Sequence, residues 1–241
     1  MRDRILIIAG LAVITALGWA YLRYDAESMH CATMAMPESR VWNLPEFGMM
    51  LAMWTIMMIA MMAPSAAPML LAFAAVNRRR RERQAPYVPT AVFLLGYIAV
   101  WTAFSVVATA AQFGLQAAAL LSPMLVSTSS VFGAGLLITA GLFQWTPLKN
   151  RCLTQCHSPF QFLMVDWREG SRGAFHMGVR HGSYCLGCCW AVMALLFVAG
   201  VMNLLWVAAL SVFVLAEKLA PKYVSRSGGA VMILAGVWLL V

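Results

Sequence analysis

The stretch that decides the fold is FGMMLAMWTIMMIAMMAPSAAPML, residues 47–70, which contains no Asp, Glu, Lys or Arg. A helix of about 20 apolar residues spans the hydrocarbon core of a bilayer, which is about 30 Å thick. The stretch therefore predicts a transmembrane helix. The composition agrees, because 62% of the 241 residues are hydrophobic and only 11% are charged. Such a chain cannot be an ordinary soluble enzyme, a disordered protein or a disulfide-rich secreted scaffold.

Apolar stretches of similar character recur along the rest of the chain. Together they predict an all-α, polytopic transmembrane helix bundle with about seven spans, in one domain that covers residues 1–241. The last two stretches are shorter than about 17 residues, the lower limit for a span. The seven stretches are Ile5–Leu22, Gly48–Phe73, Ala91–Ala119, Ser130–Trp145, Ser183–Gly200, Asn203–Ala216 and Gly228–Val241.

Lys and Arg gather in every second connection between these predicted spans. If the N-terminus is inside, 15 of the 17 basic residues are inside, and only Arg23 and Arg40 are outside. Because cytoplasmic loops carry an excess of positive charge, this predicts a cytoplasmic N-terminus, an outer loop at 23–47 and a cytoplasmic loop at 147–182. Topology also accounts for the net charge of +8 and the run Arg78–Arg81. We therefore expect the lipid bilayer as a partner, and no nucleic acid.

Methionine is concentrated in the second predicted span, where seven Met fall within residues 49–62. Met49, Met53, Met57 and Met61 recur four residues apart and so share one face of a helix. Met is a good gap-filler, so packing is one interpretation. The other is a ladder of thioether ligands, which can hold Cu(I) without a buried charge. The spacing resembles the M-x-x-x-M element of copper uptake channels.

The predicted outer loop holds a second group of soft ligands within residues 29–36. Exposed loops rarely collect Met, since Met prefers burial. The group is therefore a candidate collecting site for copper, unless the segment packs against the membrane surface. Its candidate ligands are His30, Cys31, Met34 and Met36.

The other five cysteines fall in two short segments that both lie near the predicted inner surface. Cys152 and Cys156 share a helix face, and Cys185 shares one with Cys188 and Cys189. Two such pairs can form a trigonal or tetrahedral sulfur site for Cu(I), or for zinc as the second choice. His157 and His181 are candidate further ligands. The alternatives are small buried thiols and a redox pair with the spacing Cys185-x-x-Cys188.

Several of these segments resemble a bacterial family of predicted metal-binding integral membrane proteins of unknown function. The resemblance rests on MWTIMMIAMMAPS, FQWTPLKNRCL with the following QC, GSYCLGCCW, LLFVAGVMNL and the pair Glu217–Lys218. It implies a multi-span protein of the bacterial inner membrane with a metal site. It also implies that the five inner cysteines and the Met of the second span belong to the family pattern.

Three hypotheses follow from these motifs. The first is a Cu(I)-binding protein that transports copper, or delivers it to a membrane cuproenzyme or another subunit. The second is a membrane thiol–disulfide oxidoreductase that uses Cys185 and Cys188. The third is a non-catalytic accessory subunit with a structural sulfur-ligated metal. The chain has no nucleotide-binding loop, no Ser-His-Asp set and no paired catalytic carboxylates, which favours a protein that is not an enzyme.

Overall fold

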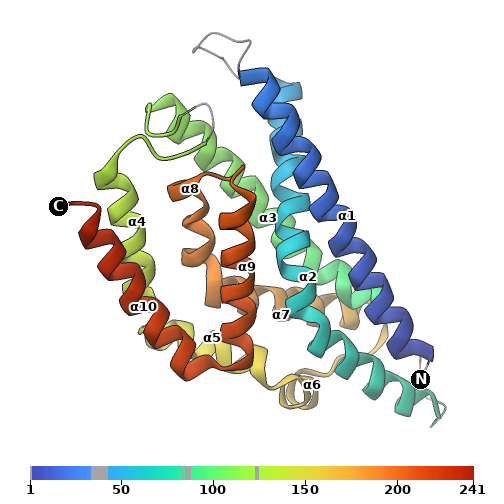
Figure 1. The fold of residues 1–241 in the computed structure, drawn as a ribbon. Coiled ribbons are helices and arrows are strands. Elements are labelled where there is room, and N and C mark those ends of the chain that lie inside the picture. Colours follow the sequence, from blue (N-terminus) through green and yellow to red (C-terminus); the bar gives the residue numbers. More distant parts are fainter. Residues whose placement is uncertain (1, 34–42, 83, 85–87, 123–124) are drawn as a thin grey trace.

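The computed structural model describes the chain except residues 1, 34–42, 83, 85–87 and 123–124. The described residues form helices and contain no strand beyond one isolated bridge between Leu121 and Ser127. This confirms the all-α prediction. The helices, shown in Figure 1, are α1 (Arg2–Thr33), α2 (Leu44–Glu82), α3 (Thr90–Ala117), α4 (Ser130–Phe143), α5 (Pro147–His157), α6 (Pro159–Asp166), α7 (Gly170–Ala194), α8 (Leu196–Ala199), α9 (Leu204–Leu219) and α10 (Pro221–Trp238).

Four helical segments of the described chain are long and apolar enough to cross a membrane. They are Asp3–Ser28, Leu44–Glu82, Thr90–Ala117 and Gly170–Ala199. A fifth would arise if α4 and α5, which meet at an angle of 65°, formed one broken span. Each of the seven predicted stretches contains a helix, but α9 and α10 do not meet the same criterion. The count of seven and the cytoplasmic N-terminus therefore stay predictions.

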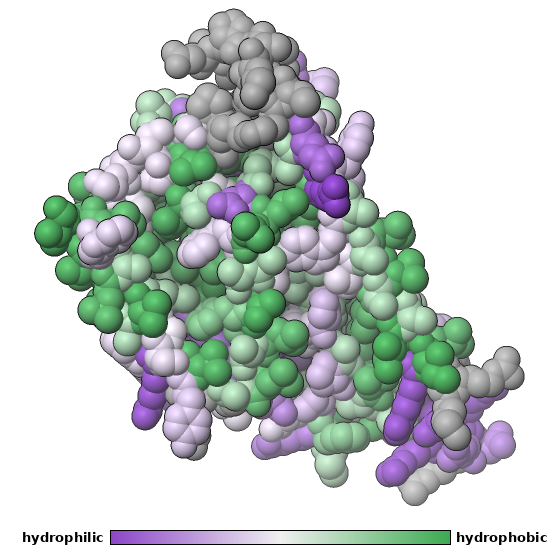
Figure 2. All heavy atoms as spheres, in the orientation of Figure 1, coloured by the Kyte–Doolittle hydropathy of each residue, from purple (hydrophilic) through white to green (hydrophobic). Residues whose placement is uncertain are grey.

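The surface is apolar over much of the bundle. Figure 2 shows hydrophobic residues across the middle of the visible face and hydrophilic residues gathered toward its lower end. Large apolar side chains such as Leu6 and Leu17 of α1 and Leu234 and Trp238 of α10 are more than half exposed. A soluble domain would bury most such side chains, so this surface is compatible with contact to lipid.

Two segments expected to be loops are largely helical. Helix α1 continues through residue 33 into the predicted outer loop, where Arg23 and Glu27 form an ion pair one turn apart at 3.0 Å. The predicted cytoplasmic loop at 147–182 holds α5, α6 and the first half of α7. The criterion of apolar length finds only the part of a helix that lies in lipid. It does not detect the amphipathic helical segments that continue beyond the lipid or lie between spans. Both loops were therefore predicted to be longer than they are.

Helix α2 lies in the interior of the bundle and packs against α1, α3 and α9 (Figure 1). It continues without interruption through Pro64 and Pro68. At its far end, the side-chain amide of Asn77 bonds both the carbonyl and the N–H of Val88, which lies just before α3. This contact ties the end of α2 to the beginning of α3.

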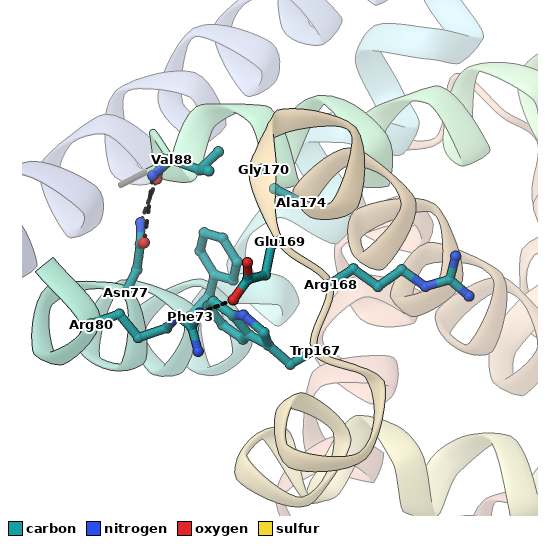
Figure 3. A pocket seen from close by; sticks show the side chains of 9 residues that line it. All are labelled: Phe73, Asn77, Arg80, Val88, Trp167, Arg168, Glu169, Gly170 and Ala174. Carbon is teal, nitrogen blue, oxygen red and sulfur yellow. Dashed lines mark hydrogen bonds and ion pairs between the residues drawn. The ribbon is translucent and has the colours of Figure 1, made fainter. Parts of the chain in front are cut away.

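The connection between α6 and α7 is anchored on the same end of α2, as Figure 3 shows. Arg80 pairs with Glu169, and its guanidinium lies 4.9 Å from the centre of the Trp167 ring. That ring stacks on Phe73 at 5.6 Å between centroids. Arg168 points away from the small cavity between these groups (Figure 3). The anchor fixes where α7 begins, and therefore how far along the bundle its cysteines lie.

Helices α3 and α7 cross at very short distance, which brings Tyr97 of α3 beside the cysteines of α7. Gly96 makes this approach possible, because a Cβ atom at that position would lie 2.2 Å from the carbonyl oxygen of Phe175. Small residues commonly allow membrane helices to pack this closely. The crossing therefore depends on the missing side chain.

Gly96→Ala should destabilise the protein by about 1–3 kcal/mol, because the added methyl group overpacks this crossing. Gly114→Ala is the matched control in the same helix, since a Cβ there meets nothing within 4 Å. The control should be neutral or stabilising, because Ala is the better helix former. Thermal unfolding in detergent compares the two. Equal melting temperatures would show that α3 and α7 do not cross at Gly96.

Candidate functional site

The structure brings the two cysteine segments together where α5 packs against α7. The Cys156 thiol of α5 is close enough to interact with the thiols of Cys185 and Cys188 of α7. Cys189 in turn interacts with the thiols of Cys185 and Cys188. We call these four residues the thiol cluster. All four lie in helices, and the described cysteines are free.

Cys152 lies at the edge of the thiol cluster. A Cβ atom at position 187 would lie only 2.8 Å from the Cys152 sulfur, so Gly187 leaves the space that this thiol occupies. The three cysteines of α7 are buried, whereas Cys152 is half-buried. The i, i+4 spacing of Cys152 and Cys156 thus does present both thiols to α7, as the sequence predicted.

Backbone hydrogen bonds hold two of the thiols at present. Cys188 and Cys189 each donate from sulfur to the carbonyl oxygen of Cys185, at 3.0 Å in both cases. Within the described part of the chain, no three His, Cys, Asp or Glu side chains are already arranged to hold one metal ion. A metal ion could be held by this cluster only if its thiols rotated from their present arrangement.

Cys185 has polar partners that the sequence did not reveal. The ammonium group of Lys218, at the end of α9, donates to the Cys185 sulfur at 3.0 Å and to the Ser65 hydroxyl at 2.7 Å. The Tyr97 hydroxyl lies 3.2 Å from the same sulfur and donates to the Met62 carbonyl. The sequence showed only that Lys218 is a charged residue at the end of an apolar span. That position does not indicate whether the side chain points into the bundle or toward the membrane surface.

A buried ion pair lies next to this group. The Lys149 ammonium of α5 donates to both carboxylate oxygens of Glu217 of α9, at 2.7 and 2.8 Å. The two side chains are 0% and 2% exposed. Ser225 of α10 donates to the same carboxylate, and a ring nitrogen of His157 lies 3.2 Å from the Glu217 carbonyl oxygen. The pair fixes α5, which carries Cys156, against α9, which carries Lys218.

The two candidate histidines have different surroundings. His157 is already engaged at the end of α5 by the Glu217 backbone. His181 lies one turn before Cys185 in α7, is buried, and stacks on Tyr97 at 5.7 Å. Its Nδ1 atom has no hydrogen-bond partner among the described residues. His181 therefore lies beside the thiol cluster and packs against Tyr97, whose hydroxyl contacts the Cys185 sulfur.

The Met face of α2 is buried inside the bundle for most of its length. Met53, Met57 and Met61 are at most 3% exposed, whereas Met49 is 60% exposed at the far end. Met58 and Met62 are also fully buried. Tyr97 and Ser65 both donate to the Met62 carbonyl. Tyr97 also contacts the Cys185 thiol directly, and Ser65 is linked to that thiol through Lys218. The end of the Met-rich segment at Met62 is thus linked to the surroundings of Cys185, which the spacing alone did not show.

The predicted collecting site in the outer segment lies mostly beyond what the structure describes. His30 and Cys31 belong to the last turns of α1, without described side chains, and Met34 and Met36 lie outside the described residues. Their role as ligands stays a prediction.

Glu217→Gln should destabilise the protein by about 3 kcal/mol or more, because it leaves the Lys149 ammonium buried without its counter-charge. The double variant Lys149→Met, Glu217→Leu should recover most of that loss, since it removes both charges. Melting temperatures in detergent measure both effects. A single variant as stable as the wild type would mean that the pair is not buried in the native protein.

Comparison with known proteins gives one match. A family model described as PpoB2: Copper chaperone matches residues 51–239, which include Met53, Met57 and Met61 of α2, the five inner cysteines and Lys218. No curated protein and no solved structure matches the chain. Because the model covers far more than half of the sequence, the chain belongs to the PpoB2 copper chaperone family.

Proposed function

We propose that this protein is an integral membrane copper chaperone that binds Cu(I) at the thiol cluster and delivers it to a membrane cuproenzyme. Copper is here the cargo. The observation that carries the proposal is the convergence of thiols from α5 and α7, two segments that lie about thirty residues apart in the chain. Family membership supports copper as the metal.

The chemistry of the cluster suits a soft monovalent ion. Thiolate and thioether sulfur are the ligands that Cu(I) prefers, and two or three of them are sufficient. The described surroundings of Cys185 and Cys188 include no Asp or Glu side chain in hydrogen-bond contact with their sulfurs, so a hard cation finds few oxygen ligands. The four apolar helices support a location in the bacterial inner membrane.

The Met face of α2 gives copper a route to the cluster through an apolar interior. Residues 49–61 cover about 18 Å at about 1.5 Å per residue. Thioethers bind Cu(I) without adding charge, and a ladder of weak sites lets the ion leave as easily as it arrives. Copper collected at the outer end could thus reach the thiols, for delivery to a partner or for transport across the membrane.

Cys156→Ser should weaken Cu(I) binding by about tenfold or more, and so should Cys185→Ser, because each removes a thiol from one shared site. The double variant should be little worse than either single variant, since the two losses are coupled. Copper and zinc stoichiometry of the purified protein under reducing conditions, with competition against a chromogenic Cu(I) chelator, measures this.

Met164→Leu is the control, because Met164 of α6 is an exposed sulfur residue outside the thiol cluster and outside the Met face. Full-strength copper binding by the Cys156→Ser, Cys185→Ser double variant would contradict the shared site. A dithiol oxidoreductase would instead need Cys185 and Cys188 but tolerate loss of Cys156. A structural zinc site would bind zinc in place of copper, and its loss would lower the melting temperature.

Replacing Met53, Met57 and Met61 with Leu should reduce copper delivery in cells while changing stability by less than about 1.5 kcal/mol per site, because Leu keeps the apolar volume. Copper content of a cuproenzyme partner, or cellular copper uptake, gives the first readout and thermal unfolding the second. Normal copper handling by the triple variant would show that these Met side chains serve packing alone.

A further inference from the structure

The ammonium group of Lys218 is partly buried and has no carboxylate among its described partners. It donates to the Ser65 hydroxyl at 2.7 Å and to the Cys185 sulfur at 3.0 Å. Ser65 donates its own proton to the Met62 carbonyl, so its oxygen accepts from Lys218 as a neutral group. The neighbouring Glu217 is occupied by Lys149 on both carboxylate oxygens.

The charges of this region therefore do not cancel without the cysteines. The Lys149–Glu217 pair is neutral in itself and is almost fully buried. Lys218 adds one positive charge beside it. Even a partly buried ammonium is stabilised by an anion near it, and the Cys185 sulfur is the group in contact that can carry negative charge.

We propose that Lys218 is the fixed counter-charge of the thiol cluster and makes it a site for a monovalent soft cation held by two thiolates. This rests on the copper function proposed above and adds the charge and the ligand number of the bound ion. Two thiolates bring two negative charges, which one Cu(I) and the Lys218 ammonium balance. The complex is then neutral as a whole, as an apolar helix bundle requires.

A divalent ion fits this arrangement less well. Zn(II) on the same two thiolates would leave the Lys218 charge without compensation. To reach neutrality Zn(II) would need a third thiolate, and to reach its preferred tetrahedral geometry a fourth ligand, so it would have to deprotonate one more thiol than Cu(I) does and engage all four thiols of the cluster. Lys218 is thus a positioning residue that sets metal selectivity through charge, and it does not itself bind the ion.

The test compares the Cu(I) and Zn(II) affinities of the purified, full-length protein in detergent, by competition with chelators. Lys218→Met should lower Cu(I) affinity by about tenfold or more and lower Zn(II) affinity less, so that the ratio of the two falls. Lys218→Arg keeps the charge and should stay close to the wild type. Arg226→Met, which removes an exposed cation from neighbouring α10, should change neither affinity.

Two results would overturn the inference: unchanged Cu(I) affinity in Lys218→Met, or equal losses for both metals, as a purely structural role would produce. If that variant does not fold, Lys218→Gln supplies the same comparison, because it keeps a donor for Ser65 without the charge. Failure of the wild type to bind Cu(I) would overturn the proposed function, and this inference with it. A loss of Cu(I) affinity that is larger than the loss of Zn(II) affinity, seen in Lys218→Met but not in Lys218→Arg or Arg226→Met, would support both the proposed function and this inference.

Discussion

The ion pair between Lys149 and Glu217 is the interaction on which the candidate site depends. It is buried, bidentate and shared by two helices that each bring one element of the site. Lys149 lies in the first turn of α5, the helix that carries Cys156. Glu217 lies in α9, directly before Lys218. Because a buried pair is costly to break, it keeps α5 and α9 in register. Without it, Cys156 and Lys218 would have no fixed position relative to the cysteines of α7.

The remaining contacts bring α7 to the same place. The close crossing at Gly96 sets α3 against α7 and puts Tyr97 beside Cys185. The anchor formed by Arg80, Glu169 and Trp167 fixes where α7 begins (Figure 3). Buried Met side chains of α2 and the thiols where α5 meets α7 are the sulfur-rich parts of this interior. A chaperone needs such a site, because it must hold Cu(I) and also release it.

Much of this could be predicted from sequence, for a clear physical reason. Helical class follows from apolar length, and the pairing of thiols follows from spacings of three and four residues. That Cys156 and Cys185 meet was inferred from their expected common depth in the membrane. The limits are equally physical. Residues 23–33 and 147–182 were predicted as connections between spans, with a helical turn expected only around Cys152 and Cys156, because hydropathy detects lipid burial and not helix formation.

The partner of each charged group was beyond sequence reasoning. Glu217 had Lys218 as its nearest candidate partner along the chain, yet it pairs with Lys149, 68 residues away. Lys218 turns inward to Cys185 and Ser65 instead of outward to the surface. Such choices depend on tertiary packing, which local pattern does not contain. The same holds for His181, a candidate further ligand, whose packing on Tyr97 the sequence did not reveal.

The most direct test of the central claim is copper-edge X-ray absorption of the purified, Cu(I)-loaded protein. A site built from the thiol cluster predicts a first shell made only of sulfur, with low coordination number. That shell should be lost when Cys156 and Cys185 are both replaced by Ser. A first shell of nitrogen or oxygen in the wild type would contradict the account, because copper would then be bound elsewhere than where α5 meets α7.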